Sequence, residues 1–517
     1  MNLVNKTVLY FNTVKYLKFT QIWHRFSFRM YHPKPDFSPA PEISIIASPG
    51  TAFPKMPNCY LGNDIFQFLN EKECFSGWNE KNRDKLWLYN LHYFDWLRQN
   101  DISTDEGNKW ILKWIEDNPP PVGNGWEPYP LSLRIVNWIK WYLCGHDLPE
   151  KARHSLAVQV RFLRKRLEYH LLANHLLANA KALVFAGVFF EGTEADQWLQ
   201  KGLEIYRKQL PEQILSDGGH FELSPMYHSI ILEDLLDLKN IHAPLELDEY
   251  IEKMSYWLSV LTGPDGKIAL FNDAADGIAL SSNRLKQYAE SLGFETKGFK
   301  TPVFFPLSGY ARISNGDLTL IADCGEIGPS YQPGHAHADA LSFEVWKGNK
   351  KIITNSGTCR YYDSPERKYQ RSSAAHNTLV VDSMDSSEIW GAHRVARRGF
   401  IVQRKLESAN AFTASFQNYA KIVHRRKWVV SDNMITIEDQ IQSKDPKEHK
   451  ISLFCHILDD LVKISTSPVL ETKSIDTLYS PKFGLFETKK SFVFTTTFRK
   501  TETIKSVLSI KPENNKQ

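Results

Sequence analysis

The amino-acid sequence predicts an α+β multidomain chain in which a helical domain precedes an antiparallel β-sandwich domain. Two observations support this fold class. Apolar residues recur at steps of three and four from about residue 60 to about residue 295, and they alternate with polar residues after about residue 300. The length of 517 residues is sufficient for two or three domains with hydrophobic cores. The change of period places the domain junction in residues 293–306.

The helical half contains several helices with connections of unequal length. Apolar residues recur at helical steps from Leu131 to Tyr142, directly after Pro130, which is typical of a helix start. Residues 174–190 are mostly apolar and predict a buried inner helix, and residues 227–238 predict another helix after a turn. Because no repeat of fixed period is present, the pattern indicates an α-helical toroid or solenoid.

The β half consists of short runs of β-branched and aromatic residues. Gly348 and Asn349 separate two of these runs and predict a hairpin turn. The predicted strands cover residues 318–322, 340–346, 351–354, 378–381, 423–430, 434–438 and 451–457. We therefore assign residues 1–58 to a basic helix and an extended lead-in, residues 59–298 to the helical domain and residues 299–517 to the β-sandwich.

The N-terminal segment is basic. No acidic residue precedes Asp36, and the basic residues before it alternate with aromatic and aliphatic ones, so the segment predicts a basic amphipathic helix. The basic residues are Lys6, Lys15, Lys18, Arg25, Arg29 and Lys34. Two interpretations stay open: contact with a membrane surface or an acidic polymer, and docking on the body of the protein.

The overall charge and hydropathy exclude several classes of function. A formal net charge of +4 is small for this length, so we expect no nucleic-acid partner. The longest strongly apolar stretch, residues 182–190, is far shorter than the ~20 residues that span a bilayer, so we expect no integral membrane segment. The N-terminus has no continuous apolar region followed by a small-residue cleavage site, which predicts a cytoplasmic location.

Polar side chains that a core does not require gather in four segments. Asn174 and His175 open the predicted inner helix, where a helix cap is the alternative explanation. Residues 217–222 contain two glycines, and Tyr227 follows at the entry to the next helix. Residues 271–277 form a polar turn after an apolar stretch. Glycine allows close backbone approach, and a tyrosine at a helix entry can point into a cleft.

The fourth segment is the richest in histidine. His335 and His337 form an HxH pattern, and Asn355 and His376 follow at a distance. On an extended strand both imidazoles of such a pattern point to one face. The histidines are therefore candidates for a metal or an acid–base set, and structural histidines are the alternative.

These segments belong to a longer series of motifs. The series comprises LWLYNLHYF at 86–94, WEPYPLS at 126–132, NHLLAN at 174–179, and residues 217–228, 334–343 and 371–378. In content and order it resembles the heparinase II/III family of polysaccharide lyases over most of the chain. The resemblance implies an incomplete (α/α) toroid packed on an antiparallel β-sandwich, with a cleft between them, which agrees with the change of period. It also implies a periplasmic location, in contrast to the absence of a visible signal.

The resemblance implies a β-elimination site. Such lyases remove the proton at C5 of a uronate and expel the glycosidic oxygen at C4, so the neighbouring carboxylate must be neutralised as charge develops. By resemblance, Asn174 and His175 lie at that carboxylate, and His175 is also a candidate base. Tyr227 matches the family tyrosine that gives a proton to the leaving oxygen, or serves as base and acid in turn. His335 matches the histidine that completes the site.

Further residues are implied as substrate-binding. Glu222 and His228 lie near Tyr227 in the sequence and are expected to support it. A tyrosine from a later loop is also expected, and Tyr361, Tyr362 and Tyr369 compete for this position. The implied partner is an acidic polysaccharide or oligosaccharide, and heparan-type, alginate-type and surface glycans all fit these residues.

The resemblance also implies a structural divalent metal, commonly zinc, and no organic cofactor. His337 and His376 match two of the ligand positions. Asn355 stands where the family usually has Asp, and an amide oxygen is a poorer zinc ligand because it carries no negative charge. Asp339 takes the ligand position of Asn355 only if the strand bends.

A glycoside hydrolase on the same toroid is one alternative. Hydrolysis needs two carboxylates across the scissile bond, which Glu222, Asp217 and Asp273 supply. This alternative leaves Tyr227 and His335 without a function.

A non-catalytic glycan-binding or assembly protein is a second alternative, from a different class. The replacement at Asn355 favours it, since a degraded metal site can accompany lost activity. The intact set of Asn174, His175, Tyr227 and His335 favours the lyase.

Overall fold

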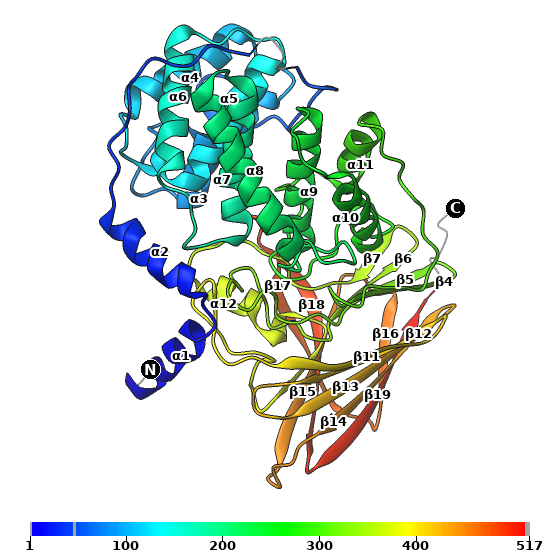
Figure 1. Cartoon of the computed structure of the whole chain (residues 1–517). Helices are drawn as coiled ribbons and strands as arrows, with labels where there is room; N and C mark the ends of the chain where they lie inside the picture. The colour runs from blue at the N-terminus through cyan, green and yellow to red at the C-terminus, as the bar shows by residue number, and fades with distance from the viewer. Residues whose placement is uncertain (1–2, 45–47, 512–517) are drawn as a thin grey trace.

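The computed structural model describes residues 3–44 and 48–511. A helical domain lies above a domain of β-sheets in the view of Figure 1. The helices of the upper domain are α3 (Lys85–Tyr93), α4 (Thr104–Asp117), α5 (Pro128–Leu143), α6 (Glu150–Arg164), α7 (Ala173–Phe189), α8 (Thr193–Gln213), α9 (Pro225–Asn240), α10 (Asp248–Leu261) and α11 (Ser282–Ser291).

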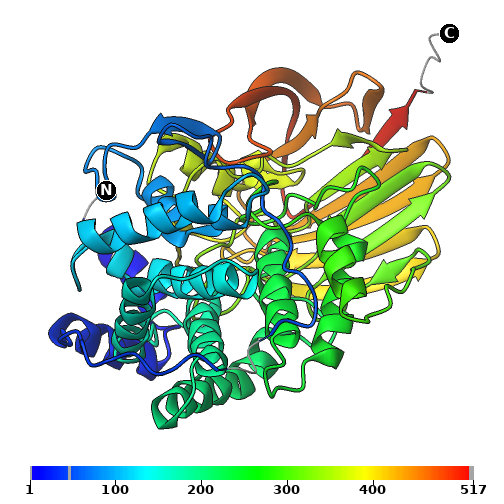
Figure 2. The same cartoon turned by 90° about the horizontal axis from the view of Figure 1, so that it is seen from above.

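The helices form an open arc. The inner helices α3, α5, α7 and α9 pack side by side, and α4, α6, α8 and α10 pack outside them. Figure 2 shows the arc from above. Almost every side chain of α7 is buried, with His175 partly exposed, so the predicted inner helix is confirmed. The predicted helical region also contains a short hairpin, β1 (Ile65–Phe68) and β2 (Glu71–Cys74).

Two antiparallel sheets form the lower domain. One sheet contains, in spatial order, β11 (Phe400–Ser408), β12 (Ala411–Gln417), β13 (Val423–Ser431), β14 (Met434–Gln442), β19 (Thr501–Ile510) and β16 (Val462–Ser467). The other contains β17 (Glu471–Tyr479), β18 (Glu487–Phe498), β15 (His449–Ile457), β7 (Lys350–Ile353), β6 (Phe343–Lys347), β5 (Leu318–Asp323), β4 (Tyr310–Asn315) and β3 (Val303–Phe304), and β8 (Leu379–Val381) pairs with β15.

The two sheets bury a common apolar core, which includes Ile313, Val345 and Trp428. The predicted hairpin turn at Gly348 joins β6 to β7. The strand predicted from residue 340 begins only at Phe343, because Leu341 has φ 60° and interrupts the extended backbone.

A separate apolar cluster joins the two domains. Trp257 and Leu261 of α10 pack in one cluster with Tyr310 of β4 and Trp346 of β6. Arg312 strengthens the junction by donating to the carbonyl of Val260 at 2.9 Å. The two domains are therefore held against each other by both apolar and polar contacts.

The N-terminal segment contains two helices, where the sequence predicts one. They are α1 (Leu3–Val14) and α2 (Phe19–Met30). Lys18 has an extended backbone and separates them, and its N–H donates to the side-chain oxygen of Gln21 at the start of α2. Across the described ranges, none of the helices combines the length and apolar character that crossing a membrane requires.

Candidate active site

A cleft of about 700 Å³ opens where the two domains meet. Residues from α3, α5, α7 and α9 line its helical wall. Loops of the β domain that contain Gly334, Tyr361 and His393 line the opposite wall. Both domains therefore contribute side chains to one cavity.

Asn174 and His175 lie in the first turn of α7, after a strained stretch of backbone. Leu172 and Ala173 have φ values of 63° and 49°, a region that L-residues rarely adopt and that costs on the order of 1–3 kcal/mol per residue. The Asn174 side chain donates to Oε1 of Glu222 at 2.8 Å and does not cap the helix. Asn174 is thus held at the cleft by a carboxylate.

His175 lies on the helical wall beside two carboxylates. Its Nδ1 lies 3.2 Å from Oε1 of Glu168, and its ring lies 4.7 Å from the ring of Tyr129. Burial alone lowers the pKa of His175, but the carboxylates of Glu168 and Glu222 outweigh it and raise the pKa above 6.5. A protonated His175 is suited to neutralise an anionic group in the cleft.

Tyr227 lies in the first turn of α9, whose start is capped by the Ser224 hydroxyl. The hydroxyls of Tyr227 and Tyr361 are 3.0 Å apart, across the domain boundary. The Tyr227 ring stacks on His335 with centroids 3.8 Å apart. Burial holds the pKa of Tyr227 well above 10, so its phenol keeps its proton at neutral pH. Tyr227 can therefore act as a proton donor.

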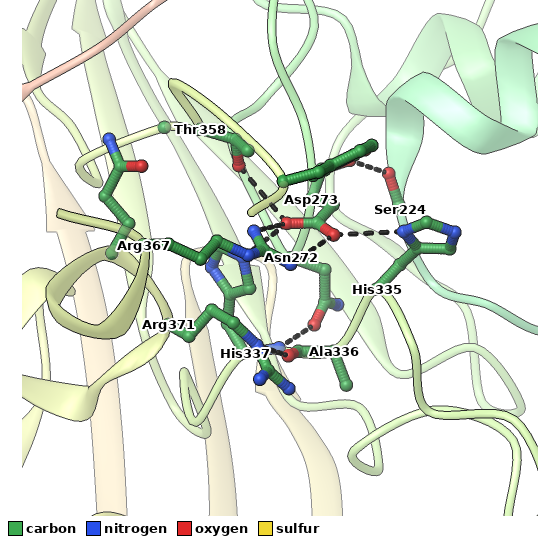
Figure 3. A network of polar contacts seen from close by, with 12 residues as sticks. Ser224, Asn272, Asp273, His335, Ala336, His337, Thr358, Arg367 and Arg371 are labelled. Carbon is green, nitrogen blue, oxygen red and sulfur yellow. Dashed lines mark hydrogen bonds and ion pairs between the residues drawn. The ribbon is translucent and has the colours of Figure 1, made fainter. Parts of the chain in front are cut away.

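Asp273 is the centre of a buried polar network (Figure 3). Its Oδ2 accepts from Nδ1 of His335 at 3.0 Å, and its Oδ1 accepts from Nε2 of His337 at 2.8 Å. Arg367 binds the same carboxylate with both of its terminal nitrogens. The bond to Asp273 places the proton of a neutral His335 on Nδ1, which leaves Nε2 as a proton acceptor.

Asp273 also connects the two domains. It lies between α10 and α11 in the helical domain, whereas Arg367 lies in α12 (Pro365–Arg371) of the β domain. Burial favours the neutral acid, but Arg367 and the two histidines hold the pKa of Asp273 well below its usual range. The charged carboxylate is therefore the stable form.

Glu222 links Asn174 to His335. Its Oε1 accepts from Asn174, and its buried Oε2 lies 3.6 Å from Nε2 of His335. Among the described residues, no hydrogen-bond donor reaches Oε2. Glu222 thus lies behind the site rather than on the cleft surface.

The predicted metal positions do not form a complete ligand set. Nδ1 of His337 and Nε2 of His376 face each other at 3.3 Å. The amide of Asn355 is engaged elsewhere: it donates to the carbonyl of Leu270 and accepts from the N–H of Asn377. Within residues 3–44 and 48–511, no group of three or more His, Cys, Asp or Glu could hold a metal ion. These residues do not fit a four-coordinate structural zinc.

Two family models match the chain on either side of the domain junction. The model for the Heparinase II/III N-terminus matches residues 79–295, and the Heparinase II/III-like, C-terminal model matches residues 300–507. The chain belongs to the heparinase II/III family.

Curated relatives of this heparinase II/III chain carry different names. A heparin-sulfate lyase of Bacteroides stercoris is 23% identical over 395 residues, covering 68% of this chain and 57% of the relative. FtsZ-localized protein C of Caulobacter vibrioides is 26% identical over 313 residues, covering 56% of this chain and 52% of the relative. The chain spans a little over half the length of these relatives.

Solved structures share the fold of this heparinase II/III chain. A crystal structure of heparinase III aligns with a TM-score of 0.68 at 18% identity, covering 96% of this chain and 90% of that chain. A crystal structure of a heparan sulfate lyase from Pedobacter heparinus aligns with a TM-score of 0.57 at 15% identity, covering 96% of this chain and 88% of that chain. The predicted incomplete toroid followed by a β-sandwich is thereby confirmed.

Like Glu222, two other predicted substrate-binding residues of the heparinase II/III chain do not reach the cleft. His228 donates from Nε2 to the Met254 carbonyl, accepts at Nδ1 from the His220 N–H, and stacks on Trp257. Tyr369 is also absent from the cleft lining, although it lies in the predicted loop region. Both are therefore structural residues rather than residues that can contact a bound glycan.

The three candidate tyrosines occupy different positions, and two of them line the cleft. Tyr361 contacts Tyr227 and lies 5.7 Å, ring to ring, from His335. Tyr362 lines the rim, is 48% exposed and hydrogen-bonds to Arg360. Tyr361 is thus the tyrosine of the β wall.

Two buried residues behind the cleft, Asp273 and Arg367, are not among the predicted lyase residues. Asp273 belongs to a segment predicted as a polar turn, and Arg367 carries no local sequence signal. Leu223 and Asn272 have φ values of 57° and 54° directly before Ser224 and Asp273. Strained non-glycine backbone of this kind gathers at functional sites, but it is visible only in the structure.

The cleft carries a cationic end. Arg25 of α2 and Arg394 both line it, and burial together with the charge of Arg394 lowers the pKa of Arg25. In the described part of the chain, no carboxylate lies within ion-pair distance of either guanidinium. In contrast, Lys140 and Lys181 at the toroid end are both paired with Asp237. The unpaired arginines are suited to meet an anionic ligand.

Proposed function

We propose that this protein is a polysaccharide lyase that cleaves an acidic, uronate-containing glycan by β-elimination. The observation that carries the proposal is the meeting of Tyr227, Tyr361 and His335 in one cleft, next to Asn174 and His175. The names of several relatives, heparin-sulfate lyases, point the same way.

In the proposed reaction, Nε2 of His335 takes the proton from C5 of the uronate. The electron pair left at C5 forms the C4–C5 double bond, and the C4–O bond breaks. Tyr227 gives its phenolic proton to the departing oxygen, which becomes the hydroxyl of the new reducing end. General acid and general base each contribute roughly 10²–10⁴-fold to such reactions.

The other wall of the cleft stabilises the charge that develops. His175, whose pKa the carboxylate of Glu168 raises, and the amide of Asn174 would face the uronate carboxylate. Fixed donors of this kind stabilise an enolate-like transition state without reorganisation. The raised pKa of His175 favours this task over proton abstraction, whereas the Nδ1-bound tautomer of His335 favours abstraction by Nε2.

The test measures the conjugated double bond of the product. Purified protein is incubated with a panel of uronate polysaccharides while ultraviolet absorbance is followed. We expect new absorbance, and we expect Tyr227→Phe to lower the rate by about 10²–10⁴-fold because the acid is lost. Tyr419→Phe, outside the cleft, is the matched control and is expected to stay within about threefold of the wild type.

Other results would change the proposal. Absorbance that survives Tyr227→Phe would remove Tyr227 as the acid and leave the lyase. New reducing ends without absorbance would indicate hydrolysis. Glycan binding without either signal would support the non-catalytic binding protein.

A further inference from the structure

The outer face of α2 is an exposed apolar stripe. The stripe consists of Phe19, Ile22, Trp23, Phe26 and Met30, which are 45 to 79% exposed. Their positions i, i+3, i+4, i+7 and i+11 place them on one face of the helix. In a globular protein this face normally packs on the core, whereas here it points away from the protein.

The opposite face of α2 is docked. The Gln21 side chain donates to the carbonyls of Leu171 and Tyr331, both at 3.3 Å. Phe28 packs on the ring of His170, with centroids 4.1 Å apart. The helix is therefore held in one orientation, and the stripe is exposed because of that orientation.

Helix α1 continues the exposed surface. Val8, Phe11 and Val14 lie on one face and are 43 to 68% exposed. The opposite face is anchored to the β domain, because Trp390 donates to the Thr13 hydroxyl at 3.0 Å and packs on Tyr10. In Figure 1, α1 and α2 follow one another along the edge of the molecule.

The same segment carries positive charge and no negative charge. Lys6, Lys15, Arg29 and Lys34 are exposed, and no acidic residue precedes Asp36. Arg398 adds to this charge where it lies over the ring of Tyr16. An apolar stripe with Trp and Phe, flanked by lysine and arginine, is the composition of helices that lie in a membrane interface.

We propose that α1 and α2 bind the surface of an anionic lipid bilayer. The apolar stripe would enter the interface, and the basic side chains would meet the headgroup phosphates. A second copy of the chain fits this surface less well, because two segments without acidic residues would face each other with like charge. The proposal does not depend on the lyase activity.

Arg25 relates the proposed membrane surface to the cleft, because it lies on α2 and also lines the cleft. Bilayer binding through the stripe would therefore bring this end of the cleft close to the membrane surface.

The test uses the full chain and sedimentation with vesicles. One set of vesicles contains phosphatidylcholine alone, and the other contains added phosphatidylglycerol. We expect binding to the anionic vesicles only, and binding that weakens as salt rises. The double variant Trp23→Ser/Phe26→Ser is expected to bind at least about tenfold more weakly.

A matched control shows whether weaker vesicle binding comes from the stripe itself or from the loss of any exposed apolar surface. Phe400 and Val402 on β11 are also exposed, and Phe400→Ser/Val402→Ser is expected to bind like the wild type. Absence of wild-type binding to anionic vesicles, or an equal loss in both double variants, would overturn the proposal. A dimer in solution that Trp23→Ser/Phe26→Ser converts to a monomer would also overturn it and assign the surface to a second copy.

Discussion

His335 and His337 are two residues apart and bind the same carboxylate, but they occupy different environments. His335 uses one oxygen of Asp273 and stacks on Tyr227 in the cleft. His337 uses the other oxygen, is 1% exposed and faces His376. Burial lowers the pKa of His337 to about 4. One carboxylate thus binds a histidine in the cleft on one side and a buried histidine on the other.

The largest effect on stability and turnover is expected from a change at Asp273, because this residue binds both His335 and His337. Asp273→Asn removes the charge that holds His335, His337 and Arg367. Because Arg367 is fully buried, loss of its partner is expected to cost about 3–5 kcal/mol of unfolding free energy. We expect turnover to fall by more than about 10³-fold as well. Denaturant unfolding and product absorbance measure the two effects, and a stable, active variant would contradict the central position of Asp273.

Separate substitutions of the two histidines are expected to differ in their effect on turnover. His335→Gln should lower turnover by about 10²–10⁴-fold, and it should cost about 1–3 kcal/mol of unfolding free energy because it also removes a donor from the Asp273 carboxylate. His337→Gln should keep turnover within about tenfold and cost about 1–3 kcal/mol, since it leaves a buried carboxylate oxygen with one donor fewer. Equal effects of the two substitutions on turnover would show that the buried side is also part of the reaction.

Acid is expected to lower the free energy of unfolding through histidines that are buried in the neutral form. Burial lowers the pKa of His228 to about 3, and both of its ring nitrogens are bound in the neutral form. The unfolded chain takes up this proton near pH 6.5, so stability is complete above that pH and falls progressively toward pH 3. Unfolding at a series of pH values measures the slope. His228→Gln should reduce the slope, and an unchanged slope would assign acid sensitivity to other groups.

The smallest effect concerns affinity at the cationic end of the cleft. Arg394→Gln is expected to raise KM for an acidic glycan by roughly three- to tenfold at low salt, with kcat unchanged. The difference should shrink as salt rises. Arg425→Gln, an exposed arginine on β13, is the control and should leave KM unchanged. A change in kcat would place Arg394 at the reacting sugar instead.

The sequence predicted the two halves of the fold, because periodicity is a local property, and it singled out Asn174, His175, Tyr227, His335, Tyr361 and Tyr362, which all line the cleft. The HxH pattern would present both imidazoles on one face of an extended strand, but residues 334–339 form a loop, in which both histidines bind Asp273. Asp273 and Arg367 are 94 residues apart, and no spacing rule connects them. His228 follows Tyr227 in the sequence but lies outside the cleft lining, because neighbours on a helix point about 100° apart.

The bond between Asp273 and Arg367 has a consequence for chimeric proteins. The carboxylate that orients the proposed base comes from the helical domain, and the arginine that keeps it charged comes from the β domain. A chimera that joins this helical domain to the β-sandwich of another family member retains the site only if that sandwich brings an arginine to the same place. The unit that can be exchanged between relatives is therefore larger than either folded domain.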